Sequence, residues 1–114
     1  MTKPGYIPDS GHIIWLDLKP RTGHEQSGRR PCLVLSGRLY AERTGLALVC
    51  PITSKVKGLP FEILLPSLQT VGAVLPIHVR SVDWQIRKAS FIEIVPTAIL
   101  KTTRAYVAAI TGIS

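Results

Sequence analysis

The stretch GRRPCLVLSGRLYAERTGLALVCPIT, residues 28–53, contains the two apolar segments that decide the fold. In the second segment, residues 46–53, every even position is apolar, and this period of two predicts a β-strand. Residues 32–36 form a shorter apolar run that is typical of a buried strand. Pro51, inside the second strand, indicates a sheet edge or a bulge at that point.

A short polar segment, residues 38–44, connects these two strands and ends at Gly45, which we interpret as a turn. If the strands pair through this connection, they run antiparallel, and the start of the first lies beside the end of the second. We therefore expect Arg30 and Thr53 to meet at one edge of the sheet. By alternation, Thr53 should point away from the face that carries the even-numbered apolar side chains.

Further short strands and one helix are expected in the rest of the chain. After Pro96, apolar side chains recur every three or four residues, which predicts an amphipathic C-terminal helix that begins at Pro96 or is capped by Thr97. This order of elements predicts a mainly β protein, a compact and partly closed antiparallel barrel with the helix packed on it. The other expected strands are residues 12–18, 61–65, 72–82 with an interruption at Pro76, and 90–95, and the apolar stripe of the helix is Ile99, Leu100, Thr103, Val107 and Ile110.

The size and charge of the chain restrict its class and its partners. We expect one domain, residues 1–114, and a cytoplasmic protein, because no apolar run is long enough to cross a bilayer and no signal peptide is apparent. Fourteen Lys and Arg against seven Asp and Glu give a net charge of +7, which favours a polyanionic partner, either nucleic acid or an acidic protein segment. Cys32 and Cys50 lie in apolar runs and are expected to be buried free thiols.

The loop before the first of these strands, residues 23–30, is rich in ionisable side chains and has no aliphatic residue. Such a loop is either merely solvated or aimed at a ligand by the strand that follows. The Arg30 guanidinium, the Thr53 hydroxyl and the Glu25 carboxylate together suit a phosphodiester. RNA supplies its own 2′-hydroxyl nucleophile, so its cleavage requires proton transfer and positive charge on the transition state. No metal or cofactor is predicted, because no metal-binding or nucleotide-binding motif is present.

Three segments of the chain carry a recognisable pattern: GHIIWLDLKPRTGHEQSGRRPCLVLS, residues 11–36, VCPITSKVKGLPFEILLP, residues 49–66, and GAVLPIHVRSVDW, residues 72–84. Within them, G-x-EQ-x-G-x-RP at residues 23–31 combined with P-x-TS at residues 51–54 is fairly specific. By these motifs the chain resembles the MazF/PemK family, the toxins of toxin–antitoxin pairs, from about Tyr6 to Gly112.

The resemblance implies a small CcdB/PemK-type, SH3-like β-barrel that forms a homodimer. It further implies an endoribonuclease that cleaves single-stranded RNA at specific sequences, without a metal or other cofactor, and leaves 2′,3′-cyclic phosphate and 5′-hydroxyl ends. An acidic antitoxin protein that covers the RNA site is implied as well.

The resemblance also implies roles for individual residues. Arg30 would stabilise the transition state and Thr53 would position the scissile phosphate. Glu25 is a candidate general base and Arg80 a phosphate contact, while the division of acid and base roles stays open. The remaining expected RNA contacts are His24, Arg29, Ser54, Lys55, Lys57 and His78.

The chain departs from the family pattern at Ile77 and His78, where many members have Asp-Gln. The acidic group that some relatives use there is missing. Histidine has an unperturbed pKa close to neutral pH, so His78 is expected to lie near the RNA as a possible replacement. An extended backbone would place His78 and Arg80 on one face. Altered specificity or weakened activity is the alternative.

Two other functions stay open. The related CcdB toxins share the barrel but act on DNA gyrase, so a non-enzymatic toxin that captures a protein is the main alternative. A degenerate family member that only binds antitoxin is the other. The combination of the Arg-Pro motif with Thr53 favours the nuclease.

Overall fold

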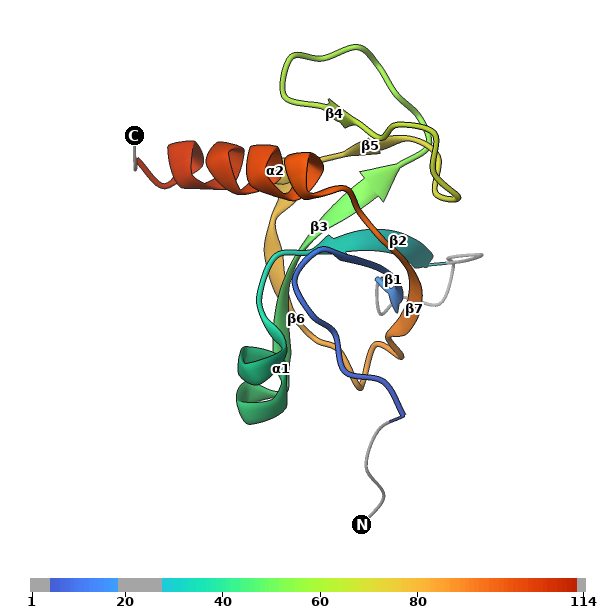
Figure 1. Cartoon of the computed structure of the whole chain (residues 1–114), viewed down its shortest axis with the longest axis vertical. Helices are drawn as coiled ribbons and strands as arrows, with labels where there is room; N and C mark the ends of the chain where they lie inside the picture. Colours follow the sequence, from blue (N-terminus) through green and yellow to red (C-terminus); the bar gives the residue numbers. More distant parts are fainter. Residues whose placement is uncertain (1–4, 19–27, 113–114) are drawn as a thin grey trace.

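The computed structural model describes residues 5–18 and 28–112, which form an open antiparallel β-barrel with helices outside it (Figure 1). The mainly β fold with a C-terminal helix, expected from the sequence, is confirmed. None of the helices in these two ranges is long and apolar enough to span a membrane. In chain order the elements are β1 (His12–Asp17), β2 (Arg29–Val34), α1 (Arg38–Thr44), β3 (Leu46–Thr53), β4 (Ile63–Leu64), β5 (Ala73–Val74), the 3₁₀ helix η1 (Pro76–His78), β6 (Arg80–Asp83), β7 (Ser90–Ile94) and α2 (Thr97–Ile110).

Strand β3 is the centre of the sheet, whose path runs β4-β5-β3-β2-β1-β7. On one side β3 pairs antiparallel with β2, as the sequence predicts. On its other side it pairs first with β6, over Leu46–Val49, and then with β5 at Ile52 and Thr53. Pro51 lies where β3 changes partner from β6 to β5, and it pairs with Cys32 of β2 in regular register. The expected sheet edge or bulge at Pro51 was therefore wrong, because β3 is an interior strand whose two neighbours on this side leave a gap at the proline.

Both faces of β3 are covered, whereas the sequence pattern predicted only one. The even positions Cys50 and Ile52 are buried in a core that includes Val107 of α2, and we call this side the α2 face. The odd positions Ala47 and Val49 are buried in a second core around Trp84 and Ala41 of α1, the α1 face. A strand with one face in solvent carries apolar side chains on the other face only. The apolar odd positions Ala47 and Val49 are therefore consistent with a strand that is buried on both faces.

The segment 38–44, for which the sequence analysis predicted only a polar connection, forms the helix α1. Gly45 ends the helix in the left-handed conformation, at φ 73°, and its N–H donates to the Ala41 carbonyl. The buried Trp84 indole donates to the same Ala41 carbonyl at 3.1 Å. Seven residues give too few turns for a helical period to show in the sequence.

The expected strand over residues 72–82 is three elements, because Pro76 opens the 3₁₀ helix η1 between β5 and β6. The C-terminal helix α2 begins at Thr97, with Pro96 at its N-cap position. Its predicted stripe faces the sheet at Ile99, Leu100, Thr103 and Val107, but the last member, Ile110, is 52% exposed.

Candidate functional site: a basic edge of the barrel

Arg30 and Thr53 stand at the neighbouring ends of the antiparallel strands β2 and β3. The paired residues of these strands are Cys32 with Pro51, Leu33 with Cys50, and Val34 with Val49. Continued by two residues to the strand ends, this register brings Arg30 opposite Thr53. Directly opposite residues of an antiparallel pair have side chains on the same face of the sheet. The strand pairing behind the predicted Arg30–Thr53 edge is therefore confirmed.

Arg80 belongs to the same face as these two residues. Arg30 and Cys32 are two residues apart in β2, so their side chains lie on the same face, and the Cys32 side chain is buried in the α1-face core. Arg80 of β6 pairs with Val49, which belongs to the same core. Burial raises the pKa of the Cys32 thiol to about 12, although the positive charges of Arg80 and Arg30 act on it in the opposite direction. Both guanidinium groups are therefore close enough to influence one buried sulfur, and a phosphate at this edge would meet both charges.

The two cysteines do not offer a nucleophile. Both are free and buried, as expected from the sequence. Burial raises the pKa of Cys50 to about 12 as well. Because the thiolate is the reactive form, neither side chain is suited to covalent catalysis near neutral pH.

The Thr53 hydroxyl is held in place by its own turn and by a neighbouring strand. Its Oγ1 accepts the N–H of Lys55 at 3.0 Å, which leaves the hydroxyl proton available to a ligand. Thr53 pairs with Ala73 of β5. Gly72, at φ 132°, approaches the Thr53 backbone so closely that a Cβ there would lie 2.0 Å from the Thr53 carbonyl oxygen. This glycine gave no signal in the sequence analysis, because its role depends on a contact between distant segments.

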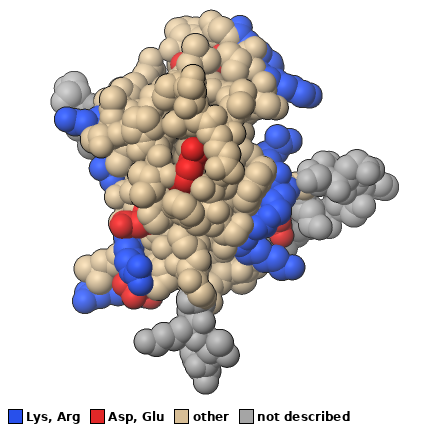
Figure 2. Space-filling model, turned by 45° about the vertical axis from the view of Figure 1, so that its right-hand side comes forward, with Lys and Arg blue, Asp and Glu red and all other residues tan. Residues whose placement is uncertain are grey.

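A basic hollow of about 220 Å³ opens beside Thr53. Lys55, Lys57 and His78 line it together with Thr53, so three of the predicted RNA contacts share one surface with the threonine. The Glu62 carboxylate fixes one wall by accepting the N–H groups of Lys57, Gly58 and Leu59. His78 reaches this hollow from η1, so the expected extended backbone was wrong at His78, whereas Arg80 begins the strand β6. Figure 2 shows Lys and Arg side chains on both sides of the molecule, with the larger group on the right of the view.

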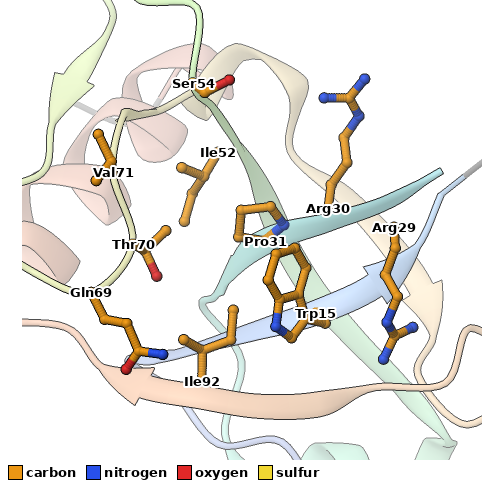
Figure 3. A pocket seen from close by; sticks show the side chains of 10 residues that line it. All are labelled: Trp15, Arg29, Arg30, Pro31, Ile52, Ser54, Gln69, Thr70, Val71 and Ile92. Atoms are coloured by element: carbon orange, nitrogen blue, oxygen red, sulfur yellow. The ribbon is translucent and has the colours of Figure 1, made fainter. Parts of the chain in front are cut away.

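A second, larger hollow of about 420 Å³ lies at the same edge, on the α2 face (Figure 3). Trp15, Pro31 and Ile52 line it, together with Ser54. Figure 3 shows Arg29 and Arg30 extending from β2 in opposite directions.

Arg29 is bound within the protein. Its guanidinium donates to Asp17 at 2.8 Å, to the Lys88 carbonyl at 2.7 Å and to the Ser90 hydroxyl at 3.0 Å. This arrangement gives Arg29 a structural role besides its predicted contact with RNA.

Two predicted site residues, His24 and Glu25, lie outside the described residues. Within residues 5–18 and 28–112, no group of three or more His, Cys, Asp or Glu side chains is arranged to hold a metal ion. The chemistry that this part of the chain supplies is thus a hydroxyl, guanidinium and ammonium groups, and the imidazole of His78.

Comparison with known proteins gives a consistent result. Residues 9–111 match the family described as PemK-like, MazF-like toxin of type II toxin–antitoxin systems. The chain is 42% identical over 85 residues to the endoribonuclease toxin MazF of Escherichia coli strain K12, covering 75% of this chain and 77% of that protein. It is 30% identical over 97 residues to the endoribonuclease PemK of Escherichia coli, covering 81% and 73%. A crystal structure of MazE–MazF (form II) from Deinococcus radiodurans contains a chain that matches with a TM-score of 0.91 at 46% identity, covering 96% and 99%.

Proposed function

Because the chain belongs to the PemK-like, MazF-like toxins of type II toxin–antitoxin systems, we propose that it is an endoribonuclease that cleaves single-stranded RNA at the Arg30–Thr53 edge. The observation that supports this proposal is the register of β2 and β3, because its continuation by two residues would set the Arg30 guanidinium opposite the Thr53 hydroxyl. Relatives named endoribonuclease MazF and PemK support the reaction class. We take the chain as a single toxin domain, residues 1–114.

The reaction is a transesterification that needs no metal. The 2′-oxygen of the RNA attacks the adjacent phosphorus, the O2′–P bond forms and the P–O5′ bond breaks. A base removes the 2′ proton and an acid supplies a proton to the leaving 5′-oxygen, so the products end in 2′,3′-cyclic phosphate and 5′-hydroxyl. Glu25 is our candidate for the base.

Arg30 and Thr53 act on the phosphate itself. The Arg30 guanidinium binds two non-bridging oxygens of the phosphate and stabilises the negative charge that develops on them. The Thr53 hydroxyl, oriented by the Lys55 N–H, donates to the same group. Arg80, on the same face, adds a second positive charge.

The basic hollow beside Thr53 would hold the neighbouring phosphates. Its exposed ammonium groups, Lys55 and Lys57, are suited to backbone contacts that carry no sequence information. His78 also lines this hollow, and we assign it to RNA contact. Ser54, which lines the second hollow, Arg29 and His24 are our other proposed RNA contacts.

We propose that the physiological partner besides RNA is an acidic antitoxin that covers this surface. A chain of similar fold and 46% identity has been crystallised as MazE–MazF. An excess of seven positive charges in this toxin is complementary to an acidic segment. A homodimer in the cytoplasm is the assembly and location that we propose, following the family.

The test is cleavage of a pooled RNA library by the wild type and by Arg30→Ala. The variant should fold normally and lose cleavage by about 10²–10³-fold, as when an oxyanion donor is removed. Arg38→Ala is the matched control, because Arg38 is an exposed arginine of α1 that pairs with Glu42 at 3.6 Å, and cleavage by this variant should not change. Intact RNA with the wild type would instead favour the non-enzymatic, gyrase-directed alternative.

A further inference from the structure

The loop between β3 and β4, residues 54–62, carries the two lysines of the basic hollow but is poorly packed. Every residue from Ser54 to Pro60 is exposed, and Figure 1 shows the loop extending away from the body of the barrel. Lys55 and Lys57 nevertheless line the hollow together with Thr53. Because an exposed loop gains little from apolar burial, its conformation depends on its hydrogen bonds.

The Glu62 carboxylate accepts three successive backbone N–H groups of this loop. Its Oε1 accepts from Lys57 at 3.1 Å, from Gly58 at 2.8 Å and from Leu59 at 3.0 Å, and its Oε2 also lies 3.2 Å from the Lys57 nitrogen. Gly58 has a φ of 75°, in the left-handed region. Successive N–H groups that converge at such a turn form a concave anion site, and here a carboxylate of the same chain occupies it.

We propose that Glu62 is a positioning residue for RNA binding, which holds the loop in the conformation that presents the Lys57 ammonium to a phosphate beside Thr53. The inference rests on the proposed function and adds a residue that acts through Lys57 without touching the RNA. A side chain on a loose loop loses conformational freedom when it binds, and a loop that is ordered beforehand avoids part of this cost.

The charge of Glu62 favours this role over a contact with the substrate. Glu62 lines the same hollow as Lys57 and His78, where a carboxylate facing a phosphate would weaken binding by repulsion. Its charge instead faces three N–H dipoles, and hydrogen bonds to an ionised acceptor are stronger than those between neutral groups. The loop that it holds therefore accounts for a negative charge on this basic surface.

Other hydrogen bonds hold the two ends of the loop. At its start, the Lys55 N–H donates to the Thr53 hydroxyl oxygen at 3.0 Å. Near its end, the Tyr106 hydroxyl of α2 donates to the Pro60 carbonyl at 3.0 Å. Loss of the carboxylate should therefore release the middle of the loop, residues 57–59, and leave the Thr53 hydroxyl in place. This division predicts weaker RNA binding with an unchanged rate at saturating RNA.

The experiment is a double-mutant cycle between Glu62 and Lys57. Equilibrium affinity is measured for the wild type, Glu62→Ala, Lys57→Ala and the double variant, on an RNA of the cleaved sequence with 2′-deoxyribose at the cut, which removes the nucleophile. Cleavage of the all-ribose RNA gives kcat and KM. Glu62→Gln keeps an oxygen acceptor, and Glu42→Ala, which removes an exposed carboxylate of α1, is the matched control. Thermal melts report whether each variant folds.

We expect Glu62→Ala to weaken affinity and raise KM by about 5- to 50-fold, with kcat within about twofold of the wild type. The double variant should bind no more weakly than Lys57→Ala alone. Glu62→Gln should keep most of the affinity, and Glu42→Ala all of it. Gly58→Ala should resemble Glu62→Ala, because alanine disfavours a φ of 75°, whereas Gly45→Ala, at a φ of 73° outside the loop, should bind RNA normally.

An equal affinity loss from Glu62→Ala in the presence and absence of Lys57 overturns the inference while leaving the nuclease intact. Tighter RNA binding by Glu62→Ala also overturns it, because the freed N–H groups would then bind phosphate themselves. A loss of kcat that Glu62→Gln does not restore overturns it as well and makes Glu62 a catalytic residue. A wild type that neither binds nor cuts RNA overturns the proposed function and this inference with it.

Discussion

Gly72 lies against the backbone of Thr53, and a Cβ on Gly72 would be 2.0 Å from the Thr53 carbonyl oxygen. The two residues are far apart in the sequence, yet this contact fixes where the end of β3 lies. The position of the Thr53 hydroxyl thus depends on a glycine of the adjoining segment, which forms no part of the catalytic chemistry.

The first prediction is that Gly72→Ala impairs both stability and cleavage. The new methyl must push the end of β3 away, at a cost of about 1–3 kcal/mol in the free energy of unfolding, and displace Thr53. Gly45→Ala is the control, because Gly45 also has a positive φ of 73° but has nothing within 4 Å of its added Cβ. Denaturant unfolding and RNA cleavage should show a stability loss in both variants and slower cleavage in Gly72→Ala alone. Equal cleavage by the two would contradict the contact's importance for the site.

The second prediction concerns the Thr53 hydroxyl. Thr53→Val keeps the shape but removes the donor, and should lower the single-turnover cleavage rate by about 10²-fold. Thr53→Ser keeps a hydroxyl that can accept the Lys55 N–H and should retain most of the activity. A fully active Thr53→Val would show that the hydroxyl does not touch the phosphate.

The third prediction uses salt to count phosphate contacts. The logarithm of RNA affinity should fall linearly with the logarithm of salt concentration, with a slope of about −0.7 for each phosphate contacted. Arg80→Ala should make this slope less steep by about 0.7, whereas Arg43→Ala, at the last turn of α1, should not change it. Identical slopes for wild type and Arg80→Ala would remove Arg80 from the RNA surface.

The fourth prediction links stability to pH through His12. The Tyr6 hydroxyl and the His12 Nδ1 are hydrogen-bonded at 2.6 Å, and burial lowers the pKa of His12 below its ordinary value of 6.5, against the smaller opposite effect of Asp9. A histidine whose pKa is lowered in the folded state favours the neutral form. Its contribution to stability is therefore complete above pH 6.5 and is lost as the pH falls through the lowered folded value.

Urea unfolding at pH 7.5 and pH 5 measures this effect. His12→Gln should lose less stability than the wild type between the two pH values. Tyr6→Phe should cost about 1 kcal/mol at pH 7.5, where the wild type has the hydrogen bond, and less at pH 5. A wild type and a His12→Gln variant with parallel pH profiles would contradict the assignment.

Local periodicity predicted the strands that matter most for the site. The period of two in β3 and the apolar run in β2 were sufficient to expect Arg30 and Thr53 at one edge, because an antiparallel register follows from a short connection. The C-terminal helix followed from the change of period at Pro96. These features depend on residues close together in the chain.

Features that depend on distant contacts were missed. Helix α1 was too short for its period to appear, and η1 redirects the backbone at His78, where the sequence favoured an extended chain. The need for Gly72 depends on the approach of the segment before β5 to the Thr53 backbone.

The central claim is metal-free transesterification at the Arg30–Thr53 edge, and the chemical ends of the cleavage products test it most directly. A synthetic RNA with the cleaved sequence is incubated with the wild type in excess EDTA, and the fragments are identified by mass spectrometry. We predict undiminished cleavage, with 2′,3′-cyclic phosphate on the upstream fragment and 5′-hydroxyl on the downstream one. Fragments with 3′-hydroxyl and 5′-phosphate ends, or cleavage abolished by EDTA, would contradict the account.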